Sequence, residues 1–236
     1  MSHSIAASLE RIGDEVRAAC RRAGRAEDAA RLVAVSKRKP SGDIRAALAA
    51  GQRDFGENYA QELRDKAREL VDVDAIRWHY IGPLQRNKVK YVVGTATLLH
   101  AVDDGRLLDA LERRAVGARL VQDVLLQVNL AAEPQKAGVS EADLPKLIEH
   151  FAHTPHLRLR GLMLMPPWDP DPEAARPLYR RLAALRVDLS SCGLDNVVLT
   201  DLSMGMSHDF AVAVEEGATL VRVGTAIFGE RPPKTW

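Results

Sequence analysis

Short apolar segments and amphipathic segments alternate along the whole chain, and this alternation restricts the possible folds more than any single motif. Eight segments are expected to be strands, and seven of them are rich in β-branched and other apolar residues. The eight are residues 31–35, 53–55, 76–81, 98–102, 121–130, 158–165, 196–200 and 219–223, of which the second is brief and has Phe55 as its one apolar residue. A helical segment follows each strand, and the last one is short. Strands that alternate with helices form parallel sheets. The pattern therefore predicts an α/β fold, a single (β/α)8 TIM-type barrel that forms one domain over residues 1–236.

An additional helix is expected before the first strand. Ile5, Leu9, Ile12 and Val16 recur at helical spacing there, and the helix should end near Gly24. An open, doubly wound sheet is the alternative to the barrel. A G-x-G-x-x-G motif does not follow the first strand and no Walker loop is found in the sequence, which argues against the nucleotide-binding versions of that sheet.

Residues that favour helix starts mark the beginning of several helices. Ser41 is placed to cap a helix that extends through residue 50, and Asn58 is placed to start one towards residue 70, with a glutamine three positions on as in a capping box. Ser140 is expected to open a helix that ends near residue 153. Ser207 is expected to open another, which stops at Gly217.

Composition excludes several classes of function. The net charge is +1 with both signs interspersed, so neither nucleic acid nor an anionic membrane is an expected partner. Cys20 and Cys192 are too few and too distant for a disulfide framework, which fits a reducing, cytoplasmic location. Charged residues interrupt segment 4–22 and exclude a secretory signal, and no apolar run is long enough to span a membrane. We expect a monomer that binds a small molecule.

The first strand ends in a lysine. In RLVAVSKRKP, residues 31–40, four apolar residues are followed at once by Ser36 and Lys37. The carboxyl ends of barrel strands meet at one mouth, where such folds build their sites. Lys37 either extends into water, as most lysines do, or contributes to a site there. The other residues expected at this mouth are Asn58, Gly82, Asn129, Met163, Met165, Ser203 to Ser207, Arg222, Gly224 and Thr225.

The last two loops at this mouth have features of a phosphate site. Ser207 is placed at a helix amino terminus, Gly224 permits close backbone approach, and Thr225 supplies a hydroxyl. Ser207 could equally be an N-cap alone and Gly224 a turn residue. A phosphate pocket beside a lysine suggests a phosphorylated carbonyl compound held as a Schiff base, with pyridoxal 5′-phosphate (PLP) as the leading candidate. The amine must then be neutral, so its pKa has to fall from about 10.4 through burial or a nearby cation such as Arg222.

Two other motifs are set aside. Ser207, His208 and Asp209 contain the letters of a hydrolase triad, but neighbouring residues cannot form that spatial arrangement. His150 and His153 lie one helical turn apart, yet no third ligand stands out among the remaining histidines. We therefore predict no metal site.

Several blocks of sequence resemble the pyridoxal phosphate homeostasis family (YggS/PROSC type), which is related to the N-terminal barrel of alanine racemase. They are AVSKRKP at 34–40, FGENYAQE at 55–62, WHYIGPLQRNK at 78–88, SMGMSHDF at 203–210 and RVGTAIFG at 222–229. Asn129, Glu133, Lys136 and Gly138 add the pattern N-x-x-x-E-x-x-K-x-G. The blocks span nearly the whole chain in the same order as in the family. Tyr80 stands where phenylalanine is expected, and the loop 168–172 matches no motif.

The resemblance implies a role for each candidate residue. Lys37 forms the Schiff base with PLP, and Arg222 lies near the pyridine nitrogen, as in alanine racemase. The phosphate is held by Ser207, Gly224 and Thr225, and the cofactor is also contacted by Asn58 and Met206. Lys136 is either a ligand-binding cation or an ordinary surface lysine.

Two classes of function follow. A PLP-dependent amino-acid racemase needs a second proton acceptor at the substrate carbon, and none can be assigned here; in alanine racemases a second domain supplies a tyrosine. We therefore name no catalytic residue. A carrier or regulator in PLP homeostasis, which supplies PLP-dependent apoenzymes and has no robust activity of its own, is the preferred interpretation.

Overall fold

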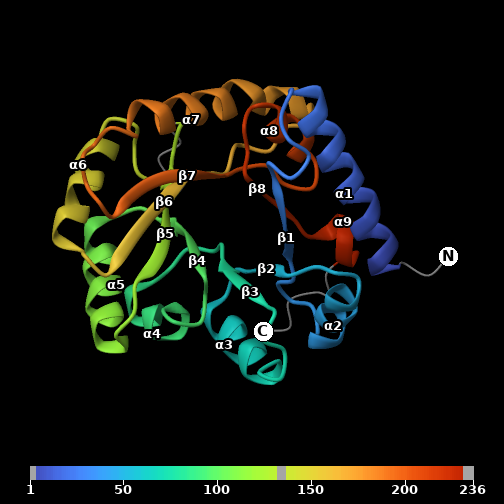
Figure 1. Cartoon of the computed structure of the whole chain (residues 1–236), viewed down its shortest axis with the longest axis horizontal. Coiled ribbons are helices and arrows are strands. Elements are labelled where there is room, and N and C mark those ends of the chain that lie inside the picture. Colours follow the sequence, from blue (N-terminus) through green and yellow to red (C-terminus); the bar gives the residue numbers. More distant parts are fainter. Residues whose placement is uncertain (1–3, 132–136, 231–236) are drawn as a thin grey trace.

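Eight parallel strands close into a barrel in the computed structural model, which describes residues 4–131 and 137–230 (Figure 1). Closure is made by β1 and β8, which pair in parallel from Arg31 opposite Leu220 to Ala34 opposite Val223. The open sheet is thereby excluded and the predicted barrel confirmed. In chain order the strands are β1 (Arg31–Val35), β2 (Asp54–Glu57), β3 (Arg77–Tyr80), β4 (Leu98–Val102), β5 (Gln122–Val128), β6 (Leu157–Leu164), β7 (Val197–Ser203) and β8 (Leu220–Val223).

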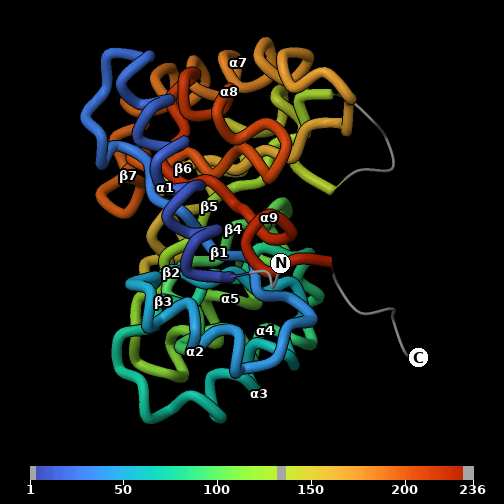
Figure 2. Tube along the Cα trace, turned by 90° about the vertical axis from the view of Figure 1, so that its right-hand side faces the viewer, coloured from blue at the N-terminus to red at the C-terminus, as the bar shows by residue number. Residues whose placement is uncertain are grey.

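Helices surround the barrel, and Figure 2 shows α7 and α8 on one side of it with α2 and α3 on the other. The helices are α1 (Ile5–Arg22), α2 (Ser41–Ala49), α3 (Ala60–Glu69), α4 (Val89–Val92), α5 (Gly105–Ala118), α6 (Leu144–Glu149), α7 (Arg176–Asp188), α8 (Phe210–Glu215) and α9 (Thr225–Phe228). The 3-10 turns η1 (Arg86–Lys88), η2 (His150–His153) and η3 (Pro172–Ala175) extend three of them. None of the helices in the described part of the chain is long and apolar enough to cross a membrane.

The core has two layers. The larger one lies between the strands and the helices, and the predicted helix α1 contributes Leu9, Ile12 and Val16 to it. The smaller one lies in the barrel interior and takes one side chain from each of five strands; it consists of Val33, Leu98, Leu125, Met163 and Leu220.

Two strands extend further than the sequence predicted. The second strand was expected to end before Gly56, but β2 continues through Gly56 and Glu57, which pair with His79 and Tyr80. A Cβ on Gly56 would lie 3.1 Å from a Val33 methyl group, so glycine is there for packing and not for a turn. The seventh strand was expected to end at Thr200. It continues to Ser203, which pairs with Met163.

The predicted helix starts were wrong at four positions. Ser41 donates its hydroxyl to Glu69 at 2.8 Å and is inside α2, so it makes no cap. Asn58 precedes α3, which begins at Ala60 after Tyr59.

The Ser140 hydroxyl closes a turn on Asp143, and α6 begins only after that turn. Ser207 lies in a turn before α8 because the Asp209 carboxylate accepts the Met206 N–H at 2.6 Å, and this bond delays the helix until residue 210.

Candidate functional site

A cavity of about 420 Å³ opens at the carboxyl ends of the strands. Its walls contain apolar side chains, including Val35, Ile81 and Met163. All seven residues that the sequence analysis assigned to cofactor binding line this one cavity, although they come from four separate parts of the chain; they are Lys37, Asn58, Met206, Ser207, Arg222, Gly224 and Thr225. Apolar walls with a few convergent polar groups are typical of small-molecule sites.

Lys37 lies in a tight turn directly after β1. The strand pairing continues one residue beyond β1, because the Ser36 N–H donates to the Gly56 carbonyl at 3.0 Å. The turn then closes through the Lys39 N–H, which donates to the Ser36 carbonyl at 3.0 Å. Arg38 has φ of 62°, a left-handed conformation that is uncommon for a residue with a side chain. The half-buried Lys37 side chain is thus carried by a constrained segment.

Arg222 on β8 is a buried cation in the wall of the cavity, with only 4% of its surface exposed. Its guanidinium donates to the Ser203 hydroxyl at 2.6 Å and to the Leu164 carbonyl at 2.9 Å. Burial lowers its pKa to about 10, partly opposed by Tyr179 and Asp209. Arg222 therefore keeps its charge at neutral pH and is fixed in orientation.

A chain of buried hydrogen bonds extends from Arg222 through the barrel interior; we call Ser203, His100, His79 and Asp54 the interior chain. Ser203 Oγ lies 2.7 Å from His100 Nδ1, His100 Nε2 lies 2.9 Å from His79 Nδ1, and His79 Nε2 lies 2.9 Å from Asp54. The Asp54 carboxylate can only accept, so with both rings neutral His79 donates to Asp54, His100 donates to His79, and the Ser203 hydroxyl donates to His100 while it accepts from Arg222. Burial holds the pKa of His100 well below its ordinary value, which agrees with this neutral tautomer.

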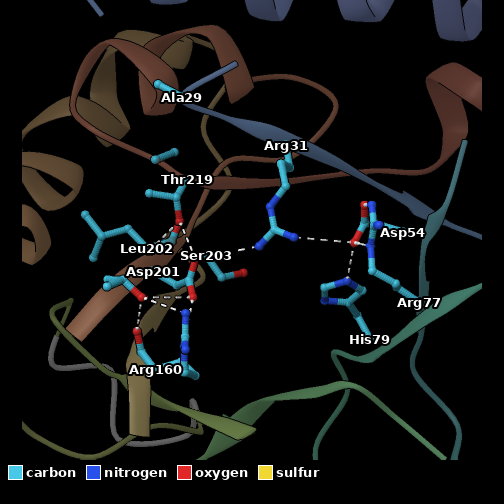
Figure 3. A network of polar contacts seen from close by, with 12 residues as sticks. Ala29, Arg31, Asp54, Arg77, His79, Arg160, Asp201, Leu202, Ser203 and Thr219 are labelled. Atoms are coloured by element: carbon cyan, nitrogen blue, oxygen red, sulfur yellow. Dashed lines mark hydrogen bonds and ion pairs between the residues drawn. The ribbon is translucent and has the colours of Figure 1, made fainter. Parts of the chain in front are cut away.

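The interior chain ends in a charged network at the amino ends of the strands. Asp54 accepts two hydrogen bonds from Arg77, at 2.9 and 2.5 Å. Figure 3 shows Arg31 between Asp54 and Asp201, and it lies 3.8 Å from each carboxylate. Burial would raise the pKa of Asp54, but the hydrogen bonds from Arg77 and His79 outweigh it and hold that pKa well below its usual range. One continuous polar path thus joins the cavity to the opposite end of the barrel.

The loops after β7 and β8 meet at the other side of the cavity. The Gly224 N–H donates to the Ser207 hydroxyl at 3.4 Å, and Thr225 is the first residue of α9. Because α8 begins after Ser207, the predicted helix terminus at that serine is wrong. Its hydroxyl nevertheless faces the same cavity as Thr225 and Lys37.

The residues present fit a phosphorylated ligand with an apolar ring. Lys37 and Arg222 supply positive charge, and two hydroxyl side chains supply hydrogen bonds. The side-chain oxygen of Asn58 is buried in the cavity lining and has no hydrogen-bond partner among the described residues. An unsatisfied buried acceptor is costly, so a ligand that donates to it would be favoured.

The rim of the cavity includes a loop to which the sequence analysis assigned no role. Trp168 is 77% exposed and its ring lies 6.4 Å from that of His208. His208 also holds the loop through its contact of 3.0 Å with the Pro170 carbonyl. Both Trp168 and His208 line the cavity. The only signal in the sequence was the position of the loop directly after a strand end.

Residues of the two motifs that were set aside make hydrogen bonds that do not belong to a triad or a metal site. Asp209 accepts hydrogen bonds from Met206 N–H and the Tyr179 hydroxyl, so it does not orient His208 as a triad would. His150 contacts Asp109 at 2.8 Å. Within residues 4–131 and 137–230, no group of three or more His, Cys, Asp or Glu is placed to hold a metal ion.

Part of the expected N-x-x-x-E-x-x-K-x-G loop lies outside the described residues, namely Glu133 and Lys136. Its two ends are described. The Asn129 N–H donates to the Val139 carbonyl at 2.9 Å, and Gly138 has φ of 128°, a conformation that favours glycine. A Cβ at Gly138 would approach the Asn129 nitrogen to 2.9 Å, so the two ends pack closely.

Fold and cavity together define a TIM barrel that binds a small anionic ligand at the carboxyl ends of its strands. The family model described as alanine racemase, N-terminal domain, matches residues 8–232. A curated relative from Aquifex aeolicus, named pyridoxal phosphate homeostasis protein, is 45% identical over 223 residues, which cover 94% of this chain and 96% of the relative. The chain belongs to the alanine racemase N-terminal domain family and, within it, to the pyridoxal phosphate homeostasis proteins.

Solved structures agree with this assignment. PipY of Synechococcus elongatus without PLP has a TM-score of 0.85 at 36% identity, covering 95% of this chain and 100% of PipY. The structure of PipY with PLP bound has a TM-score of 0.80 at 37% identity, covering 91% of this chain and 99% of PipY. The predicted family is confirmed over nearly the whole length.

Proposed function

We propose that this chain binds PLP in the cavity at the barrel mouth and acts in PLP homeostasis, as a carrier or regulator of the cofactor. The observation that carries the proposal is the PLP-bound structure of PipY, a protein that matches this chain over 91% of its length. The cavity of about 420 Å³ lies in the size range of small-molecule sites. PLP-dependent apoenzymes are the recipients we propose, and the carrier is proposed as a single-domain monomer.

Lys37 is the residue we propose to hold the aldehyde of PLP as a Schiff base. The neutral amine condenses with the aldehyde carbon, and the carbonyl oxygen leaves as water with the two amine protons. The bond is reversible, which suits storage and release. Ser207, Gly224 and Thr225 are proposed to hold the phosphate, while Asn58 and Met206 contact the rest of the cofactor.

Arg222 is proposed to face the pyridine nitrogen. A guanidinium donates hydrogen bonds but has no acceptor, so it cannot accept a hydrogen bond from a protonated ring nitrogen, whereas it can donate one to an unprotonated nitrogen. The ring is therefore kept unprotonated, which weakens its capacity to withdraw electrons from an attached amino acid. Arg222 is held in place by Ser203 and Leu164 and retains its charge. A permanent cation beside the ring nitrogen therefore supports a protein that stores PLP and does not support one that catalyses reactions of amino acids with it.

Absorption spectroscopy tests the proposal. Purified protein loaded with PLP should show a Schiff-base band, and borohydride should convert it into a permanent lysine adduct. Lys37→Ala should abolish both. Lys39→Ala is the matched control, because the Lys39 amine instead contacts the carbonyls of Phe228 and Glu230, both at 2.6 Å, and should leave the band unchanged. A band that survives in Lys37→Ala would refute the assignment, and Lys37-dependent amino-acid turnover would refute the carrier role.

A further inference from the structure

The turn that carries Lys37 is held from outside the barrel by three charged side chains. Lys66 on α3 has its amine 2.7 Å from each of three oxygens: the Ser36 carbonyl, Glu57 Oε1 and Glu62 Oε1. An ammonium group has three hydrogens to donate, so all of them are used. We call Glu57, Glu62 and Lys66 the turn clamp.

The two carboxylates of the turn clamp also contact the turn directly. Glu57 Oε1 accepts the Ser36 hydroxyl at 2.7 Å, and Glu62 Oε1 accepts the Arg38 N–H at 2.5 Å. The residue before Lys37 is therefore held at its carbonyl and hydroxyl, and the residue after it is held at its amide. The backbone on both sides of Lys37 is fixed by the turn clamp.

The burial of these charged groups lowers the stability of the fold. The Glu57 side chain is fully buried and that of Lys66 is 8% exposed, and burying an ion pair often costs more than the pair returns. Glu57 Oε2 is also buried without a hydrogen-bond partner among the described residues. The left-handed Arg38 adds backbone strain, which persists only where the surroundings enforce it. An apolar cluster would stabilise this contact of α3 with the barrel at lower cost, so the turn clamp points to a role in the site.

We propose that Glu57, Glu62 and Lys66 are positioning residues that hold the turn 36–38 so that the Lys37 amine meets the aldehyde carbon of PLP in a preorganised geometry. This inference rests on the proposed function. Covalent bond formation requires the reacting atoms to be aligned, whereas noncovalent contacts of the phosphate and the ring depend on other parts of the cavity. Loss of the turn clamp should therefore weaken the covalent bond and spare the noncovalent contacts.

Two ligands separate these contributions: PLP, and pyridoxine 5′-phosphate, which has an alcohol in place of the aldehyde. In the wild type PLP should bind more tightly than the alcohol. Lys66→Met should reduce the affinity for PLP by about ten- to a hundredfold, the range expected for one charge-assisted hydrogen bond, and leave the affinity for the alcohol unchanged. Glu62→Ala is the milder second variant, because it removes the acceptor of the Arg38 N–H and its side chain is already 21% exposed.

Leu63→Ala is the matched control for stability. Leu63 is fully buried on the same helix but belongs to the apolar core, so its truncation destabilises the fold without removing a contact to the turn. It should change neither affinity. If Lys66→Met and Glu62→Ala keep the wild-type preference for PLP, or lose affinity for both ligands to the same extent, the turn clamp is only structural and the proposal is overturned.

The preference for PLP over the alcohol in Lys37→Ala distinguishes failure of the proposed function from failure of the turn clamp. If the wild type and Lys37→Ala show the same preference between the two ligands, no covalent bond forms at Lys37, and both proposals are overturned. If Lys37→Ala alone loses the preference, the proposed function is upheld and only the turn clamp is overturned.

Discussion

Glu57 gives the sharpest test of the electrostatics around Lys37, because it is a carboxyl group that the fold makes difficult to ionise. Burial raises its pKa from 4.5 to about 7, against the opposing effect of Lys66. Between these two values the folded protein binds a proton at Glu57 that the unfolded chain has released. The free energy of unfolding must therefore fall as the pH rises through this interval.

The size of this effect follows from the two pKa values. The interval from 4.5 to about 7 corresponds to about 3 kcal/mol of unfolding free energy, at about 1.4 kcal/mol for each pH unit. The contribution is fully present below pH 4.5 and is lost once the pH exceeds about 7. Glu57→Gln cannot ionise, so the variant should not show this loss.

Urea unfolding of the cofactor-free protein, followed by circular dichroism at pH steps from about 4.5 to 8, measures the effect. The unfolding free energy of Glu57→Gln minus that of the wild type should increase by about 3 kcal/mol from the acid end to pH 7 and remain constant above it. Titrating groups that do not interact with Glu57 cancel in this difference. Parallel curves for the two proteins, or a difference that increases towards acid, would show that the carboxylate is ionised in the fold at all these pH values and would refute the reasoning.

Two more perturbations test the supports of the cavity. Asp54→Asn removes the charge that anchors His79 and should cost about 3 kcal/mol at pH 7, as for other broken buried pairs. Because the pKa of Asp54 is lowered in the fold, the stability that its charge contributes should begin to decrease as the pH falls below 3.8. The difference in unfolding free energy between wild type and variant should therefore be smaller at pH 3 than at pH 7. Gly82→Ala should reduce both stability and PLP affinity in thermal melts and titrations, because its Cβ would lie 2.2 Å from the Asn58 carbonyl oxygen. Gly117→Ala, inside α5 with no atom within 4 Å, should instead stabilise the protein by about 0.5–1 kcal/mol.

The barrel was predictable because strand and helix alternate strictly along the chain. Each parallel strand needs a crossover helix before the next one, so eight repeats of that alternation favour closure. Lys37 was identifiable because the polarity changes abruptly at the end of β1, and Arg222 and Thr225 were expected at the same mouth because they lie at the carboxyl end of the last strand. These predictions depend only on order along the chain, which the sequence contains directly.

The interior chain could not be predicted in the same way. His79 and His100 were considered only as metal ligands, since a strand of a parallel barrel is apolar on both faces and its sequence does not show which side chains point inward. Ser203 lies 103 residues from its partner His100. The predicted end of β7 at residue 200 placed Ser203 in the loop at the mouth and not on the strand, where its side chain meets His100.

The turn clamp was missed for a related reason. A lysine on a surface helix is ordinarily solvated, and nothing in the spacing of Lys66 from Glu57 shows that α3 buries it. The one signal in the sequence was the occurrence of two acidic residues in the short segment DFGE. In the structure this segment is strand β2, and all four of its residues are buried.

β2 connects the two polar systems of this barrel. Asp54 points inward to His79 and Glu57 points outward to Lys66, as expected for residues three apart on a strand. Burial raises the pKa of both carboxyls, but for Asp54 the hydrogen bonds from Arg77 and His79 on its two oxygens outweigh burial, whereas for Glu57 burial prevails over Lys66. One oxygen of Glu57 also has no hydrogen-bond partner among the described residues. Near neutral pH Asp54 stays ionised while Glu57 titrates. We therefore expect a pH change around 7 to alter the charge of the turn clamp, while Asp54, the anchor of the interior chain behind Arg222, keeps its charge.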